Sequence, residues 1–538
     1  MKKVKDLFFG FNDAENFKRK EYKELFTKFF TRTTNLSETL LPHKYFLIGD
    51  KGTGKTALAV FLSNTDYKSY KSNLVYIRET EYQKFVSMKK EKHLTLSDYQ
   101  HIWNVILLLL IAKQIENEEK QSVLFSRFSR FKPLKEAIEE FYQKAFSPEI
   151  IYALNFVEDS KRAAELLCEY FTLNGETSRS ESFSESRFQI NLLYIQKKFE
   201  SAISSLKLEN NHIIFIDGID IRPRNIDYEE YLECIKGLAN AMWAINNDFL
   251  SNIKDSKGRI KIVLLIRPDI FASLGLQNQN NKIKDNGVLL DWKTTYPKYR
   301  DSEIFKMIEN ILTSQQDKKE EDSEITCWDY YFPYQTLSQK KKEDSFVSFL
   351  RFSMFKPRDI ISMLNIIQEN FIRETKRKWP IFCESDFTHP DFRRKYGDYL
   401  LGEVKDYLSF YHSDQDYELF LKFFEYLDGK LTFTYDEYMQ AYDNFADYVE
   451  RNNINVPIFF ESSDKFLQFI YQLNIICFID KTIENEDLYH WCFRERSYAN
   501  LNPKVKYGVT YKLHYGLNKV FNVGKQVQRR TIKINKQK

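Results

Sequence analysis

The segment FLIGDKGTGKTALAVFL, residues 46–62, carries the clearest signal in this chain. An apolar run ends at Gly49, three glycines fall within six residues, and an apolar, helix-forming run follows Thr56. The chain has only 16 glycines among 538 residues, so their concentration here needs a local reason. Residues 49–56 fit the pattern G-x-x-x-x-G-K-[ST], which is typical of a loop that binds nucleotide phosphates.

Each position of this loop suits that chemistry. Bare backbone N–H groups hold the phosphates, which favours glycine, and the helix that begins near Gly54 directs the positive end of its dipole at the same anion. We expect Lys55 to reach the β- and γ-phosphates and Thr56 to offer its hydroxyl to Mg²⁺. The alternative is a glycine-rich turn without a ligand. We predict ATP and Mg²⁺ as cofactors, with the nucleotide lying against Gly49, Asp50, Lys51, Gly52, Thr53, Gly54, Lys55, Thr56 and Ala57.

An acidic partner is expected at the end of another buried strand, and NHIIFIDGIDIRP supplies one. The apolar run 213–216 ends at Asp217, which we predict to hold Mg²⁺ together with Thr56. Asp220 follows three residues later and is a candidate for orienting or activating the attacking water. The alternative for both carboxylates is a role in a turn, since Asp-Gly is a common turn dipeptide.

Three further segments complete an α/β pattern. The apolar run 262–266 ends at Arg267, which either reaches the γ-phosphate or forms a surface pair with Asp269. Residues 72–79 and 287–292 have the character of two more strands. Five β segments separated by helical ones predict a five-stranded parallel sheet.

Composition limits the possible classes of protein. A length of 538 residues predicts two to four domains, and 43% hydrophobic residues with few Pro and Gly predicts a helix-rich globular chain. Lys and Arg number 80 against 76 Asp and Glu, which by itself does not indicate nucleic-acid binding. Six scattered cysteines without a CxxC pair favour a reducing compartment. No signal peptide is evident, and the longest apolar run, 105–112, is too short for a bilayer, so we expect a cytoplasmic protein without a membrane partner.

The order of these motifs resembles that of AAA+-type P-loop ATPases of the signal-transduction branch, which includes NACHT and origin-recognition-like ATPases. More narrowly, it resembles a bacterial P-loop ATPase family found in phage-defence contexts. The resemblance spans about residues 7 to 365. Its motifs are LFFGFNDAE (7–15), GDKGTGKT (49–56), IDGID (216–220), IRPDIF (266–271), LLDW (289–292) and KPRDII (356–361).

The resemblance implies a five-stranded sheet, then a helical lid and a winged-helix domain. It also implies that Arg267 acts as a sensor-one residue and that Arg358 is a sensor-two arginine that reports the nucleotide to the lid. Two residues depart from the pattern: Gly218 stands where AAA+ enzymes usually carry a catalytic Glu, and Ile221 stands where NACHT-like motifs often carry an acid. These departures predict slow hydrolysis and a long-lived ATP-bound state.

We therefore predict a P-loop NTPase domain at 1–312 with a helical insertion at 80–211, a helical lid at 313–413, and a winged-helix-like domain at 414–538. Within the insertion, the Ser-rich stretch 174–187 is expected to be an exposed loop, and 313–326 and 339–344 to be charged connections. In the last domain, 466–480 has the pattern of a helix running into a strand, and 488–501 that of a returning strand.

The C-terminal residues 501–538 carry ten Lys and Arg and no acid. They either contact nucleic-acid phosphates or form a basic solubilising tail, and the winged helix has the further alternative of binding protein. For an arginine finger that acts on a neighbouring subunit, the candidates are Arg222, Arg224 and Arg300.

Three functions are consistent with these features. The first is an ATP-driven switch in bacterial anti-phage defence, which couples nucleotide state to self-assembly or to a protein effector. The second is a DNA-acting AAA+ ATPase, such as an origin-recognition or transposition regulator, that uses the winged helix and basic tail. The third is a nucleotide-binding sensor with little turnover. Bound ADP that never turns over would favour the third, and DNA-stimulated hydrolysis the second.

Overall fold

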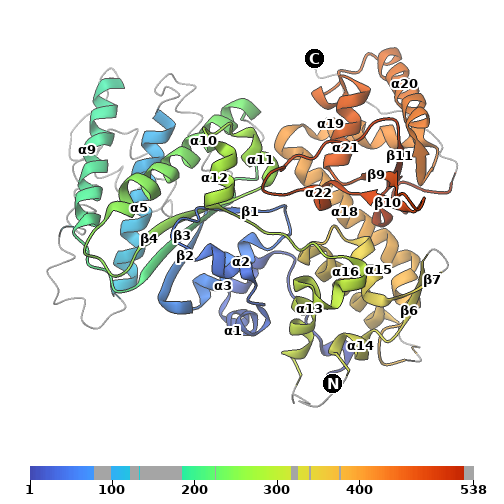
Figure 1. Cartoon of the computed structure of the whole chain (residues 1–538), viewed down its shortest axis with the longest axis horizontal. Coiled ribbons are helices and arrows are strands. Elements are labelled where there is room, and N and C mark those ends of the chain that lie inside the picture. Colours follow the sequence, from blue (N-terminus) through green and yellow to red (C-terminus); the bar gives the residue numbers. More distant parts are fainter. Residues whose placement is uncertain are drawn as a thin grey trace, which may run out of the picture. The chain divides into compact units, whose positions relative to one another are not determined.

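The computed structural model of the chain describes residues 1–77, 98–120, 133, 185–223, 226–316, 325–338, 341–374, 377 and 379–525. The chain forms two compact units (Figure 1). The first, called the sheet unit, contains Thr34–Gly49 and Lys55–Leu289. The second, called the helical unit, contains Met1–Thr33, Asp50–Gly54 and Leu290–Lys538. The two units divide near residue 289, while the domains expected at 1–312, 313–413 and 414–538 stay predictions. The N-terminal segment belongs to the helical unit because Val4, Leu7 and Phe9 are buried in its core.

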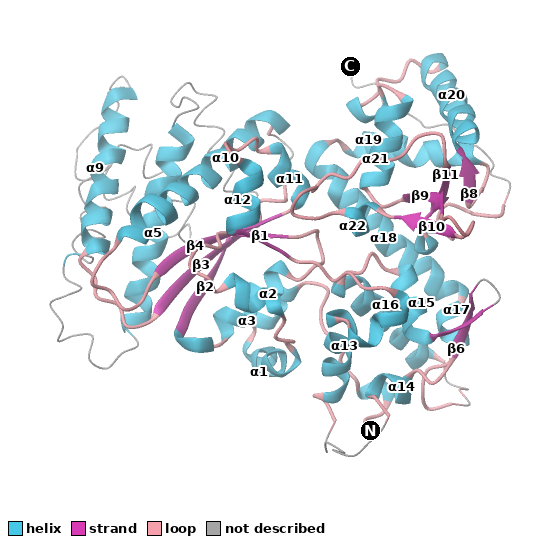
Figure 2. Cartoon of the chain, viewed as in Figure 1, coloured by secondary structure: helices cyan, strands magenta, loops and turns pink. Residues whose placement is uncertain are grey.

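The sheet unit contains the predicted five-stranded parallel sheet (Figure 2). Its strands lie in the order β2-β3-β4-β1-β5, and every neighbouring pair is parallel. The central strands β3 and β4 are apolar and buried, as expected for a sheet covered on both faces. The bounds are β1 Phe46–Ile48, β2 Tyr70–Tyr76, β3 Asn211–Asp217, β4 Ile260–Ile266 and β5 Gly287–Leu289.

The strand order determines where the helices lie. The connection from β1 to β2 crosses the sheet in one direction, and the later connections cross it in the other. Because parallel crossovers are right-handed, helix α3 (Lys55–Asn64) covers one face, while α10 (Tyr228–Ala244), α11 (Pro268–Ser273) and α12 (Gln279–Asn286) cover the other. Figure 1 shows α3 and α10 on opposite sides of the sheet.

Two helices of the sheet unit come from the predicted insertion. Helix α5 (Asp98–Lys120) contains the apolar run 105–112 and packs against both α10 and α9 (Glu185–Ser204). Residues 80–97, 121–132 and 134–184 of the predicted insertion, which include most of the Ser-rich stretch, lie outside the described residues. None of the helices in the described part of the chain combines the length and the apolar character that a membrane span requires.

The helical unit is built around an aromatic core. Stacked rings such as Trp328 on Phe332 and edge-to-face rings such as Trp328 against Phe346 fill its interior. Its helices are α1 (Lys20–Phe29), α13 (Glu303–Thr313), α14 (Cys327–Tyr331), α15 (Ser345–Phe352), α16 (Pro357–Arg373), α17 (Glu384–Thr388), α18 (Pro390–Tyr411), α19 (Asp414–Phe423), α20 (Tyr435–Arg451), α21 (Ser463–Gln472) and α22 (Cys492–Glu495).

Two antiparallel sheets belong to the helical unit. The larger has the order β10-β9-β11-β8, with β8 Thr432–Thr434, β9 Ile476–Lys481, β10 Asp487–His490 and β11 Thr510–Leu513. The predicted helix followed by a hairpin is confirmed by α21, β9 and β10. The returning strand ends at His490, however, because the chain turns into α22 instead of continuing to residue 501. Residues 341–344, predicted as part of a connection, form β7, which pairs with β6 (Gln335–Ser338).

Candidate nucleotide-binding site

Three predicted site segments meet at one edge of the parallel sheet. Ile48 of β1 is in register with Ile266 of β4, and Leu264 of β4 is in register with Ile216 of β3. Gly49, Asp217 and Arg267 therefore lie at the carboxyl ends of three adjacent strands. The chain leaves β1 toward one face of the sheet and leaves β4 toward the other. Open α/β sheets bind their ligands in the crevice between two such diverging connections.

The residues predicted to bind phosphate and Mg²⁺ lie around Lys55, the first residue of α3. Its buried ammonium donates a 2.7 Å hydrogen bond to the carbonyl oxygen of Gly49. Thr56 Oγ1 donates to Asp217 Oδ2 at 2.6 Å, although the two residues are 161 positions apart. The two residues predicted to hold Mg²⁺ are thus in direct contact, and Ala57 follows Thr56 on α3.

The electrostatics of Asp217 suit a cation. Burial is the main cause that raises the pKa of its carboxyl, and the nearby negative charge of Asp220 raises the pKa further. Thr56, Lys55 and the amide of Gly218 act in the opposite direction. A carboxylate in this position gains from a neighbouring cation, because the cation offsets both desolvation and the charge of Asp220. A magnesium ion here would be held by Thr56 Oγ1 and the carboxylate of Asp217, with water and phosphate oxygens as its other ligands.

The departure at Gly218 has a backbone cause. Its φ is +91°, a region that side chains other than glycine rarely adopt, and an added Cβ would lie 2.6 Å from the carbonyl oxygen of Ile77. The Ile77 amide in turn donates to the carbonyl of Asp217 at 2.9 Å, so β2 closes tightly over this turn. A catalytic glutamate therefore does not fit at position 218 without a shift of the backbone.

Arg267 is occupied by a neighbouring acid. Its Nε and NH2 groups donate to the two carboxylate oxygens of Asp269 at 3.0 and 2.5 Å. The pair matches the alternative considered from the sequence, except that it is buried rather than on the surface, since Arg267 is 2% exposed. To contact a phosphate, the Arg267 guanidinium would have to give up or share its hydrogen bonds to Asp269.

The middle of the glycine-rich loop, residues 50–54, is held by the helical unit. The amide of Arg358, in the first turn of α16, donates to the carbonyl of Gly52 at 3.3 Å. Gly52 has a φ of +87°, and a Cβ there would lie 3.0 Å from the Cβ of Arg358. Trp292 Nε1 donates to the carbonyl of Thr53 at 2.8 Å. Glycine at position 52 is therefore required both by its backbone conformation and by the close approach of α16.

Two ion pairs also hold the loop. Asp50 pairs with Arg496, which follows α22, and Lys51 pairs with Asp406 of α18. The first pair is the more buried, with side-chain exposures of 16% and 7%, whereas those of the second are 34% and 56%. Because screening by water weakens exposed pairs, the Asp50–Arg496 pair is expected to be the stronger restraint.

The side chain of Arg358 lies in an acidic environment. Burial disfavours its charge, but Glu403 and neighbouring acidic groups outweigh burial and raise the pKa of Arg358. The contacts from Arg358 NH1 to the Glu403 oxygens are long, at 3.4 and 3.5 Å. The neighbouring Asp359 is buried and accepts a hydrogen bond from the amide of Met354. Its carboxylate is the acidic group that the first turn of a helix favours.

Sequence reasoning missed several residues of this site. Arg496, Asp406 and Glu403 were not predicted, and no local motif marks them. Trp292 was noted only as part of LLDW, and it lies beyond the end of β5. Of the predicted arginine-finger candidates, Arg222 donates to the carbonyl of Ile226, and Arg300 is held by Asp329 and Asp344. Arg224 lies outside the described residues.

Comparison with curated proteins finds a distant relative. A "Putative transposon gamma-delta 80.3 kDa protein" of Escherichia coli (strain K12) is 23% identical over 381 residues, which cover 68% of this chain and 47% of that protein. The chain thus spans about half the length of the curated relative it matches. No protein-family model matches the chain.

Proposed function

We propose that the chain is an AAA+-type ATPase that uses Mg²⁺ and works as a switch. The observation that carries this proposal is the contact from Thr56 Oγ1 to Asp217 Oδ2 beside the buried Lys55, at the carboxyl end of a parallel sheet. A hydroxyl, a carboxylate and an ammonium in this order are what a magnesium–triphosphate group requires. A glycine-rich turn without a ligand would not need a buried lysine at the start of α3.

Each residue has a defined task in this proposal. The ammonium of Lys55 exchanges its contact with the Gly49 carbonyl for phosphate oxygens. Mg²⁺, when bound, neutralises phosphate charge between Thr56 and Asp217. Asp220 lies near enough to influence the pKa of Asp217 and is the group proposed to orient the attacking water. Since position 218 has no acid, Asp220 alone serves the water and turnover is slow.

The switch is proposed to act through residues 50–54. These residues are covalently part of the phosphate loop, yet their contacts are with α16, α18 and the segment after α22. We interpret α15 to α18 as the lid. The order α19, β8, α20, α21, β9, β10 is helix, strand, helix, helix and hairpin, which supports a winged helix. A phosphate that reshapes the loop would disturb the contacts of Asp50, Lys51 and Gly52. The change in nucleotide state would thereby reach both the lid and the winged helix.

What the switch controls is also a proposal. The resemblance to ATPases of phage-defence contexts favours a response in which nucleotide state changes self-assembly or the binding of a protein effector. A variant of this proposal is a sensor that binds nucleotide but hydrolyses little of it. The backbone at Gly218 is consistent with this variant, because it leaves no room for a catalytic glutamate. Measured ADP retention distinguishes these two forms.

A DNA-acting ATPase is the second candidate, favoured by the similarity to a transposon-encoded protein. The surface of α21 gives it little support. Its one cation, Lys465, pairs with Glu461, and the amide of Gln468 is held at both ends by backbone of residues 503 and 505. A helix that reads a DNA groove presents free polar and basic side chains. DNA binding would therefore depend on the basic tail.

The tail itself is only partly available for phosphate backbone. Lys506 pairs with Asp480 at 2.7 Å, and Lys512 is buried with its Nζ donating to Tyr515. Residues 526–538, with five of the ten cations, lie outside the described residues. If DNA binds, its affinity should fall steeply with salt, and deletion of residues 524–538 should flatten that slope. DNA-stimulated hydrolysis would favour this candidate over the first.

Hydrolysis assays on two carboxylate variants test the first candidate. Asp217→Asn should keep part of the nucleotide affinity but lose its dependence on Mg²⁺. Asp220→Asn should leave Mg²⁺·ATP affinity within about twofold and lower the turnover rate by about 100-fold, the range for a lost catalytic base. Equal turnover in Asp220→Asn and wild type would show that the water is oriented by another group.

A further inference from the structure

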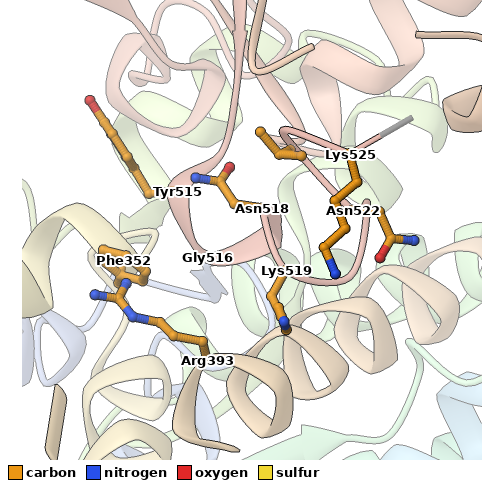
Figure 3. Close-up of a pocket in the computed structure, with 9 residues that line it drawn as sticks. Phe352, Arg393, Tyr515, Gly516, Asn518, Lys519, Asn522 and Lys525 are labelled. Carbon is orange, nitrogen blue, oxygen red and sulfur yellow. The ribbon is translucent and has the colours of Figure 1, made fainter. Parts of the chain in front are cut away.

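A second anion site is suggested by a pocket of about 290 Å³ within the helical unit. Figure 3 shows Arg393 of α18 against Phe352 of α15, with the side chains of Lys519 and Lys525 across the hollow. Tyr515 and Asn518 complete the parts of the lining that bear on its chemistry. In the part of the chain that the structure describes, the lining contains three cations and no carboxylate.

Arg393 is unlike the other arginines around it. Its guanidinium lies 3.9 Å from the ring centroid of Phe352 and 4.7 Å from that of Phe387, but it makes no hydrogen bond or ion pair with another described residue. Arg351, for comparison, donates through Nε to Glu343 at 2.9 Å. A desolvated cation without a carboxylate is costly unless another anion joins it.

The rest of the lining repeats this pattern. Among the described residues, Lys519 and Lys525 have no acidic partner, whereas Lys506 of the same tail is paired with Asp480. The sequence offers none nearby, since residues 501–538 contain neither Asp nor Glu. Asn518 Oδ1 is buried without a hydrogen-bond donor. Because the two ends of an amide are interchangeable in placement, Asn518 can present its NH₂ group to an anion instead.

We propose that this pocket binds the phosphate group of a small phosphorylated molecule, with Arg393, Lys519 and Lys525 as its charged contacts. Planar guanidinium with two ammonium groups is a combination that neutralises a phosphate dianion. The volume is at the small end of ligand pockets, which favours free phosphate or a mononucleotide over a larger ligand. Burial lowers the pKa of Arg393 to about 10, so the group is still charged at neutral pH.

This site has consequences apart from the phosphate loop. A bound phosphate would connect α18 to the segment after β11, two parts of the chain more than 120 residues apart. It would thereby link the C-terminal segment to α18, the helix that also carries Asp406. The inference does not rest on the proposed ATPase function, because all of its residues lie outside the glycine-rich loop.

Calorimetric titration of inorganic phosphate into full-length Lys55→Ala protein tests the proposal, since that change removes the lysine of the other phosphate site. We expect one phosphate per chain with a Kd of about 1 mM or tighter. Arg393→Gln should weaken binding by at least about tenfold, because a charged hydrogen-bonding group is lost. The matched control is Arg394→Gln, an exposed neighbour paired with Asp391, which should leave the Kd within about twofold.

A second variant protects the test from misfolding. Lys519→Gln with Lys525→Gln changes two exposed side chains and should also weaken phosphate by about tenfold. Titration with 5′-AMP separates the sources: tighter binding than phosphate indicates a nucleotide ligand, and equal binding indicates recognition of phosphate alone. Absence of saturable binding up to about 10 mM phosphate would overturn the proposal. Unchanged phosphate affinity in both variants would also overturn it. If the variants weakened the binding of duplex DNA but not of phosphate, the cations would serve DNA instead, and the proposal would likewise fail.

Discussion

Asp50 of the glycine-rich loop forms an ion pair with Arg496, 446 residues later in the chain. The partners come from the loop between β1 and α3 and from the segment after α22. A pair at this position connects the glycine-rich loop to the segment after α22. Any ligand that changes the loop must keep, stretch or break it, which makes the pair a physical element of the proposed switch.

Arg496→Gln should loosen the loop when no nucleotide is present. Removing one partner of a largely buried pair leaves the other uncompensated, so hydrogen exchange in a peptide covering residues 50–54 should be about tenfold faster. Lys51→Gln is the matched control, because the pair of Lys51 with Asp406 is more exposed. Its loss should speed hydrogen exchange by less than about threefold. Equal exchange in the two variants would show that the Asp50 pair does not restrain the loop.

Gly218→Ala should destabilise the sheet unit by about 2–3 kcal/mol, because it combines a strained φ with a clash against the Ile77 carbonyl. Gly275→Ala controls for the strain alone, since its φ is +57° with open space around it, and it should cost about 1 kcal/mol. Urea unfolding measures both. Gly218→Glu, although it restores the acid usual in AAA+ enzymes, should not raise hydrolysis. A stable and faster Gly218→Glu protein would refute the steric account.

His514 should make the helical unit sensitive to acid. Burial, helped by the charges of Arg494 and Lys356, lowers the pKa of its imidazole from 6.5 to about 4, although the hydrogen bond with the Ser353 carbonyl acts in the opposite direction. The folded state therefore keeps the ring neutral while the unfolded chain takes up a proton below pH 6.5. Stability is complete above that pH and is lost as the pH falls toward 4.

The difference between these pKa values corresponds to about 3 kcal/mol at low pH. Urea midpoints of wild type and His514→Gln measured between pH 7.5 and about 4 test this, because the variant cannot take up the proton. The gap between the two curves should change in favour of the variant as the pH falls. Parallel curves would show that His514 does not contribute to acid sensitivity.

The parts of this structure that follow local physics could be predicted. Apolar runs ending in Gly49, Asp217 and Arg267 indicated parallel strands whose carboxyl ends meet, and the register places them so. Chemistry then predicted that Thr56 and Asp217 share a site, and they are in contact. Each of these inferences needed only residue type and position relative to a strand or helix end.

The parts that depend on long-range packing could not be predicted. Nothing near Arg496 marks it as a partner of Asp50, because the sequence holds many arginines and a pairing is set by tertiary structure. The short strands β8 and β11 have too few residues for a recognisable alternation, and β7 is charged throughout. The environment of Arg393 could not be predicted either, since an arginine on a helix is usually solvated. Here its guanidinium lies against aromatic rings such as that of Phe352, which only the tertiary structure brings together.

The most direct test of the central claim is an equilibrium titration of the purified protein with fluorescent ATP in the presence of Mg²⁺. Wild type should bind one nucleotide per chain in a saturable manner. Lys55→Ala should bind about 100-fold more weakly, or roughly 3 kcal/mol, because no other side chain replaces its charge beside Gly49. Chelation of Mg²⁺ should weaken wild type and leave Asp217→Asn little changed. Binding of equal strength by wild type and Lys55→Ala would contradict the assignment of the phosphate loop.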